Sequence, residues 1–279
     1  MSPRPGFPAR LPLDGATKGA TKVTTKGPAL GQPLSPTAKV PAPATANRSA
    51  PTVSVRPQQA SPAGLGLDSA AVRARMVQQI ARTGVQDPLV LQAMGQVERH
   101  RFVESALVGQ AYEDTSLPIG WGQTISKPNV VARMVELLRG GTQGRLGRVL
   151  EIGTGCGYQA AVLSQVATEV YSIERLKGLH ERARENLRPF RLPNVHLLFG
   201  DGMQGYAAGA PYAGIISAAG GDQLPAAWLE QLAPGARLVA PTVTPAGHQA
   251  LMVVEKTAAG LRHSVYEAVH FVPLKSGVA

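Results

Sequence analysis

Cysteine and long apolar runs are scarce in this sequence. Cys156 is the single cysteine among 279 residues, which excludes an internal disulfide and any zinc site built from clustered cysteines and is typical of a reducing compartment. No apolar run approaches the roughly 18 residues that a bilayer-spanning helix needs. The first ten residues contain no apolar stretch typical of a secretory signal. These absences predict a soluble, cytoplasmic protein.

Acidic residues are nearly absent from the first 67 residues. This segment holds eight Lys or Arg, a single acid (Asp14) and 12 of the 23 prolines, so it contributes +7 to the net charge of +10. Its apolar residues follow no period of 2 or 3.6, and we predict a disordered, basic, Pro-rich tail over 1–67. Such a tail can bind nucleic acid or an acidic membrane by neutralising phosphates. Its charges are spread out and Phe7 is its one aromatic residue, so a solvated extension is favoured over nucleic-acid binding, and a transit peptide is a third interpretation.

The remaining residues, 68–279, have the periodic patterns of an ordered domain. Asp68 is a suitable N-cap for a helix whose apolar residues continue at helical spacing to Ile80. Asp87 followed by Pro88 indicates the start of a second helix, because Asp favours the cap position and Pro the first helical position. The sequence therefore predicts a helical segment over 68–145 and a different architecture over 146–279.

Short apolar strands alternate with helices after residue 145. This alternation predicts an α/β fold with a doubly wound, mostly parallel sheet and helices on both faces. The last two strands have no helix between them, so we expect them to pair antiparallel at one edge. The expected strands are Arg148–Ile152, Glu169–Ile173, Asn194–Phe199, Tyr212–Ser217, Ala236–Ala240, Ala250–Glu255 and Ser264–Phe271, and the expected helices are 158–166, 176–188 and 225–232.

The first expected strand leads into a glycine-rich loop, Gly153-Thr154-Gly155-Cys156-Gly157. Glycines let the backbone turn sharply and approach a ligand, and the following helix favours an anionic group at its N-terminus. The residue after Gly157 is Tyr158, so the dinucleotide fingerprint G-x-G-x-x-G is not met. Glu151 would repel a pyrophosphate but suits a ligand that carries an ammonium or sulfonium charge. Taken alone, the loop is equally compatible with a tight strand–helix turn that binds nothing.

Two further acids follow the next two strands. Glu174 stands where a carboxylate can accept both hydroxyls of a ribose, and it would reject a 2′-phosphate. Asp201, followed by Gly202, stands where a carboxylate can accept from an adenine amino group. Each acid alone could be a solvated carboxylate at a strand end. Together with Glu151 they indicate an adenosine with a positively charged tail, which points to S-adenosylmethionine.

A third signal, Gly122-Gln123-Thr124-Ile125-Ser126, precedes the sheet. Residues 127–139 have helical spacing, so we expect Ser126 to be the N-cap, with Pro128 in the first turn. That structural role is favoured when the motif is taken alone, although a hydroxyl and free amides at a helix N-terminus also receive a carboxylate. No histidine lies nearby in sequence to support a Ser-His-Asp hydrolase. The six histidines lack metal-ligand spacing, so no metal is expected.

These residues resemble the protein-L-isoaspartate O-methyltransferase family. The Gly-Gln-Thr-Ile-Ser run is specific to that family, the glycine loop is shared by many methyltransferases, and the resemblance covers about 68–279. It implies a Rossmann-like fold of the class I S-adenosylmethionine-dependent methyltransferases, with a seven-stranded sheet and added N-terminal helices that form the substrate segment. The matching segments are Arg101-Phe102-Val103, Leu117–Gly120, Gly122–Ser126, Val149–Tyr158, Glu174-Arg175, Gly200-Asp201-Gly202 and Phe271–Leu274.

The resemblance also implies a reaction. A protein-L-isoaspartate(D-aspartate) O-methyltransferase moves a methyl group from S-adenosylmethionine to the free α-carboxylate of an L-isoaspartyl residue in a damaged protein or peptide, and releases S-adenosyl-L-homocysteine. The ester recloses to a succinimide that can reopen as normal aspartate, which repairs the chain. By resemblance Ser126 is the catalytic residue, and the protein is a monomer. The implied cofactor-binding residues are Gln123, Thr124, Ile125, Ser126, Glu151, Gly153, Gly155, Glu174, Asp201 and Gly202.

Some positions depart from the family pattern, and two other functions stay open. Ala213 stands where an Asp is common, and Ser217-Ala218-Ala219 replaces a Val-Thr-Ala-like run, so the departures concern the fourth strand and the peptide groove. One alternative is a methyltransferase of the same fold that acts on RNA or a small molecule, with the basic tail as a nucleic-acid handle. The other is a non-catalytic module that binds adenosine or nucleic acid, which the Ser126 run combined with three strand-end acids disfavours.

Overall fold

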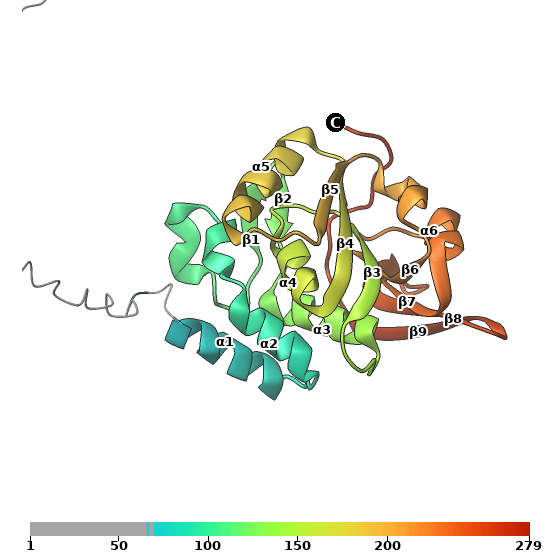
Figure 1. The fold of residues 1–279 in the computed structure, drawn as a ribbon, viewed down its shortest axis with the longest axis horizontal. Helices are drawn as coiled ribbons and strands as arrows, with labels where there is room; N and C mark the ends of the chain where they lie inside the picture. The colour runs from blue at the N-terminus through green and yellow to red at the C-terminus, as the bar shows by residue number, and fades with distance from the viewer. Residues whose placement is uncertain (1–65, 67–69) are drawn as a thin grey trace, which may run out of the picture. The chain divides into compact units, whose positions relative to one another are not determined.

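The computed structural model describes Gly66 and residues 70–279 (Figure 1). Apart from Gly66, the tail predicted over 1–67 lies outside the described residues, and so does the cap predicted at Asp68. Within the described part of the chain, no helix combines the length and the apolar character that crossing a membrane requires.

Helices and a short hairpin form the first part of the described chain. Asp87 caps the second helix as predicted, because its Oδ1 accepts hydrogen bonds from the amides of Leu89 and Val90 at 2.9 and 3.2 Å. The hairpin joins these helices to a third helix that leads into the sheet. In chain order the elements are α1 (Ala70–Arg82), α2 (Pro88–Gln96), the 3₁₀ helices η1 (Arg99–Phe102) and η2 (Ser105–Gln110), the strands β1 (Leu117–Gly120) and β2 (Gln123–Ile125), and α3 (Pro128–Arg139).

A seven-stranded sheet follows, in the order β5-β4-β3-β6-β7-β8-β9. The pairs among β5, β4, β3, β6 and β7 are parallel, whereas β8 pairs antiparallel with both β7 and β9, so the mostly parallel sheet and its antiparallel edge are confirmed. The strands are β3 (Leu146–Ile152), β4 (Ala167–Glu174), β5 (Val195–Phe199), β6 (Tyr212–Ser217), β7 (Leu232–Val243), β8 (Gln249–Thr257) and β9 (Gly260–Ala268). The helices among them are α4 (Tyr158–Val166), α5 (Lys177–Leu187) and α6 (Ala226–Gln231), with the short 3₁₀ helices η3 (Arg188–Phe190), η4 (Gly202–Gln204) and η5 (Ala207–Gly209).

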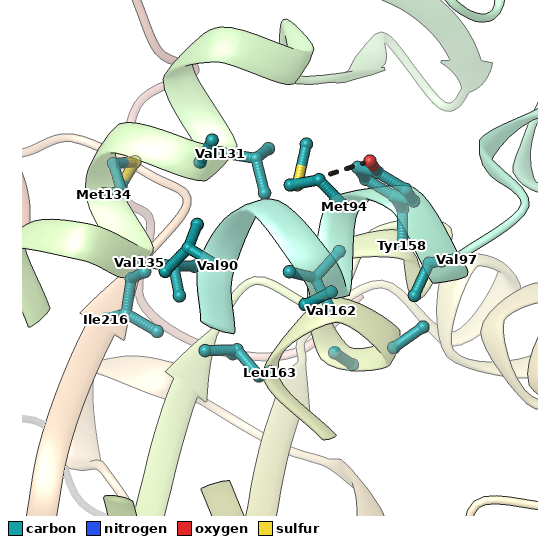
Figure 2. Packing of buried hydrophobic residues seen from close by; sticks show 14 of the residues in the cluster. Val90, Met94, Val97, Val131, Met134, Val135, Tyr158, Val162, Leu163 and Ile216 are labelled. Carbon is teal, nitrogen blue, oxygen red and sulfur yellow. Dashed lines mark hydrogen bonds between the residues drawn. The ribbon is translucent and has the colours of Figure 1, made fainter. Parts of the chain in front are cut away.

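Helices cover both faces of the sheet because buried residues alternate along its strands. Val149 of β3 packs in a core with residues of α2, α3 and α4, whereas the next residue, Leu150, packs in a second core with Trp228 of α6. Figure 2 shows the first core, where Met94 of α2 lies beside Tyr158 of α4, whose hydroxyl donates to the Met94 sulfur at 3.7 Å. This packing fixes the N-terminal helices on the sheet that carries the glycine loop.

The last strand is displaced from its predicted position. It spans Gly260–Ala268 rather than Ser264–Phe271, because the chain reverses tightly between Thr257 and Gly260, which pair with each other. Phe271 is buried after the strand has ended, and its amide donates to the Gln249 side chain at 2.7 Å. The apolar residues near the C-terminus therefore pack as a separate segment and do not extend the sheet.

Candidate active site

A cleft of about 470 Å³ lies at the carboxyl ends of the central strands. β3 has β4 on one side and β6 on the other, so the winding of the chain reverses at β3, which is where ligands bind in open α/β sheets. The walls are Ile119, Trp121, Gly122, Gln123, Thr124, Ser126, Ile152, Gly153, Gly155, Ile173, Glu174, Arg175, Leu176, Leu179, Gly202, Ala218, Ala219 and Val272 to Lys275.

The glycine loop lies in this cleft with the geometry that only glycine adopts easily. Gly153 and Gly155 have φ values of +87° and +56°. The Gly153 amide donates to the carbonyl of Ile173 at 2.9 Å, which ties the loop to the end of β4. Both glycines line the cleft and present backbone without a side chain to it.

Glu174 is the strand-end acid that the cleft contains. Its side chain accepts a hydrogen bond from the Gly155 amide at Oε2 and another from the Leu176 amide at Oε1, both at 2.9 Å. The residue is only 4% exposed, yet it forms part of the cleft wall. Two backbone donors thus fix the carboxylate, which has further lone pairs that can accept from a ligand.

Glu151 lies beneath the loop and does not line the cleft. It is fully buried, and the Ser172 hydroxyl donates to its Oε2. Burial raises the pKa of Glu151 to about 8, which the Ser172 and Gln159 side chains offset only in part. Its Oε1 has no hydrogen-bond partner among the described residues. Since a pKa near 8 keeps the carboxyl mostly neutral at pH 7, Glu151 does not present a negative charge to the cleft.

Asp201 and Ile125 also lie outside the cleft wall. The carboxylate of Asp201 accepts from the Met203 amide at 2.9 Å and from the Gly277 amide at 2.7 Å, and its neighbour Gly202 reaches the cleft instead. Ile125 is 4% exposed and pairs with Leu117 in the β1–β2 hairpin. The cofactor-binding roles of Asp201 and Ile125 therefore stay predictions, and residues next to each of them form the cleft wall.

The prediction that Ser126 caps the following helix is wrong. α3 begins at Pro128 with Lys127 as the N-cap, and no side chain of that cap residue bonds the helix. Pro128 has no amide hydrogen, so the first donor that needs a partner is the Asn129 amide, and Asp114 accepts from it at 2.9 Å. Ser126 is consequently released from the cap position, and it lines the cleft together with Gln123 and Thr124.

Two parts of the wall were not among the predicted site residues, although both lie in or next to segments that resemble the family. Trp121 lines the cleft from the turn between β1 and β2, and its position inside the Gly120–Ser126 motif was the available signal. Val272 to Lys275 close the opposite side, where the carbonyl of Val272 and the amide of Leu274 bond to Gly220 at 2.9 and 2.6 Å. The C-terminal segment is thus part of the site.

Neither a reactive cysteine nor a cluster of metal-ligating side chains is found among the described residues. Cys156 is buried in the glycine loop, and burial raises the pKa of its thiol to about 11, so the thiol stays protonated and unreactive at neutral pH. Among the described residues, no three His, Cys, Asp or Glu side chains gather as a metal site would require.

Comparison with known proteins identifies close relatives. Residues 71–279 match the model of the family described as protein-L-isoaspartate(D-aspartate) O-methyltransferase. A protein-L-isoaspartate O-methyltransferase of Leptothrix cholodnii is 53% identical, over 99% of this chain and 96% of its own length. Another, from Methylibium petroleiphilum, is 58% identical over 78% of this chain and 82% of its own.

Solved structures agree with the fold. A protein-L-isoaspartate O-methyltransferase structure superposes with a TM-score of 0.66 and 28% identity, covering 74% of this chain and 67% of that one. A structure from Plasmodium falciparum in complex with S-adenosyl-L-homocysteine gives a TM-score of 0.61 at 22% identity, covering 73% of this chain and 98% of that one. The predicted class I methyltransferase fold is confirmed.

Proposed function

Since the chain belongs to the protein-L-isoaspartate O-methyltransferase family, whose reaction is the S-adenosylmethionine-dependent methylation of isoaspartyl residues, we propose that the cleft at the carboxyl ends of β3, β4 and β6 is where this chain carries it out. The observation that carries the proposal is the meeting of the glycine loop, Glu174 and Ser126 in one cleft of about 470 Å³. The volume lies within the range of small-molecule sites.

The nucleoside is assigned to the strand ends. Glu174 accepts hydrogen bonds from the ribose hydroxyls. The Gly155 and Leu176 amides support this role, because they fix the carboxylate before the ligand binds. Gly153 and Gly155 let the backbone approach the methionine part of the cofactor. Gly202 contacts the adenine, and Asp201 acts through the backbone that it braces next to Gly202.

The reacting groups are assigned to the other end of the cleft. Gln123, Thr124 and Ser126 line it, and Ile125 holds their strand in place by packing in the core. Ser126 is the proposed catalytic residue, with its hydroxyl donating to the acceptor carboxylate and orienting it toward the methyl group. Glu151 is assigned an indirect role, which is to support the glycine loop from below.

The proposed chemistry needs few catalytic groups. A free α-carboxylate has a pKa of about 3.5 and is ionised at neutral pH, so the acceptor requires no general base. Carboxylate and sulfonium neutralise each other during an in-line displacement, which a cleft that excludes water favours. Alignment of two bound reactants lowers the barrier by up to about 7–11 kcal/mol. Positioning is therefore the main work of the side chains.

Partners and location follow from the same assignment. We propose that isoaspartyl proteins and peptides are the substrates, that the chain acts as a monomer in the cytoplasm, and that the basic segment 1–67 is a solvated extension without a role in nucleic-acid binding. The single buried, free Cys156 supports a reducing compartment. Light scattering on the eluting protein tests the monomer, and a dimeric mass contradicts it.

One labelling experiment tests the substrate. The protein is incubated with methyl-labelled S-adenosylmethionine and, in separate reactions, an isoaspartyl peptide, the same peptide with a normal aspartyl residue, and RNA. We expect label in the isoaspartyl peptide alone. Label in RNA, or equal label in both peptides, contradicts the proposal, and adding RNA to the peptide reaction shows whether the basic segment diverts the enzyme.

A further inference from the structure

Trp121 is the feature of the cleft that the assignments above leave unexplained. Its side chain lines the cleft although 56% of its surface is exposed. Its φ is +51°, in the left-handed region that a bulky residue rarely adopts, and the flanking Gly120 and Gly122 have φ values of +91° and +69°. Backbone strain of this kind concentrates at ligand-binding sites. The turn thus holds a large aromatic side chain in a partly exposed position, although burial of that side chain would be more favourable in free energy.

The position of the Trp121 indole is fixed against helix α5. A Cβ atom on Gly178 would lie 2.3 Å from Cζ2 of the indole, so the ring rests directly on the helix backbone. Arg182 of the same helix donates to the Ile119 carbonyl at 2.9 Å, which anchors the β1–β2 hairpin to α5. Since α5 begins shortly after Glu174, the indole stands over the helix that starts at the proposed ribose site.

Apolar side chains line the same cleft as the Glu174 carboxylate. Leu176 and Leu179 line the cleft beside Trp121, and Leu179 is almost completely buried, whereas the indole keeps a free face. A nucleoside combines hydroxyls that need a carboxylate with flat faces that need apolar contact. Glu174 and the wall next to it offer both.

We infer that Trp121 binds the nucleoside end of the cofactor, with its indole packed against the adenosine that Glu174 holds. This inference rests on the proposed function, because the assignment of the ribose to Glu174 brings the nucleoside to this wall. Aromatic rings pack on nucleobases through their faces, without hydrogen bonds. The indole thereby covers the cofactor from the solvent side and slows its release. The isoaspartyl peptide is the other candidate occupant.

Binding and kinetics separate these occupants. Calorimetry with S-adenosyl-L-homocysteine measures the Kd for the wild type, for Trp121→Ala and for Trp121→Phe. We expect the Kd of Trp121→Ala to rise about tenfold, which is the scale of base–aromatic stacking, and that of Trp121→Phe to rise less. The KM for an isoaspartyl peptide at saturating S-adenosylmethionine should stay unchanged in both variants.

Two further variants serve as matched controls. Gly178→Ala places a Cβ under the indole and forces the ring to move, while Ala favours the helix more than Gly does, so a weaker Kd here cannot come from a weakened helix. Tyr266→Ala removes another exposed aromatic side chain from β9, at the far edge of the sheet from β5, and should leave the Kd unchanged.

The outcomes test the role of Trp121 separately from the proposed cofactor site. If the wild type fails to bind S-adenosyl-L-homocysteine, the proposed cofactor site is wrong. If the wild type binds but Trp121→Ala and Gly178→Ala bind equally well, the cofactor site stands and the inference about Trp121 is overturned. If Trp121→Ala raises the peptide KM and leaves the Kd unchanged, the indole contacts the peptide, which also overturns the inference.

Discussion

Replacing Glu151 by Gln should make the protein more stable at neutral and alkaline pH. The side chain is fully buried beneath the glycine loop, and burial raises its pKa from 4.5 to about 8. In the unfolded chain the group releases its proton near its ordinary pKa, so between these two values the native state binds a proton that the unfolded state has lost. The free energy of unfolding therefore falls as the pH rises through this window.

The size of the effect follows from the width of the window. From 4.5 to about 8 is a span of about 3.5 pH units, and each unit corresponds to about 1.36 kcal/mol, so Glu151 reduces stability by up to about 5 kcal/mol above its native pKa. Gln has nearly the same shape and no charge to lose. The advantage of Glu151→Gln should therefore be close to zero at about pH 4 and reach several kcal/mol at about pH 8.5.

Urea unfolding at several pH values measures this difference. The control is Glu185→Gln on α5, where the replaced side chain is exposed and the substitution should change the stability little at every pH. If the stability of Glu151→Gln falls with pH as steeply as that of the wild type, then the Glu151 carboxyl is ionised in the native state. The conclusion that burial keeps this carboxyl neutral at pH 7 would then be wrong.

The other predictions concern Ser126 and two polar contacts of the N-terminal helices. Ser126→Ala should lower kcat with an isoaspartyl peptide by about 10- to 100-fold, the scale of a hydrogen bond to a charged group, with the Kd for S-adenosyl-L-homocysteine unchanged; an unchanged kcat would leave Ser126 without a catalytic role. Asp114→Ala removes the acceptor for the Asn129 amide at the start of α3 and should cost about 1 kcal/mol in urea unfolding, and a loss near zero would mean that water replaces the carboxylate. Arg139→Met removes the partner of Asp87, whose Oδ2 lies 2.7 Å from the Arg139 Nε. Because both side chains are largely buried, thermal or urea unfolding should show a loss of about 3 kcal/mol or more, and an unchanged stability would show that the pair is solvated.

The sequence was sufficient where the determining contact is local. Asp87 could be recognised as a cap because its partners are the next amides along the chain. Ser126 could not be excluded as a cap in the same way, because the acceptor for the Asn129 amide is Asp114, which lies in a loop before the hairpin. The local pattern located both helix starts to within a residue. At the second helix a tertiary contact, from Asp114, supplies the hydrogen-bond acceptor.

The candidate site shows the same division. Glu151 and Glu174 look alike in sequence, since each stands where a strand meets a loop. Glu151 stands one residue before the end of β3 and does not reach the cleft, whereas Glu174 is the last residue of β4 and lines it. The extent of each strand decides this difference, and a shift of one or two residues is beyond what apolar patterning resolves.

The path of residues 272–277 has a consequence for how the cleft is completed. Val272 to Lys275 supply one wall of the cleft, and Gly277 bonds to Asp201. A nascent chain still missing these residues already contains the glycine loop and Ser126, but it has no enclosure for the methyl donor. The enclosure therefore forms only when the chain beyond the last strand, β9, folds back onto the sheet.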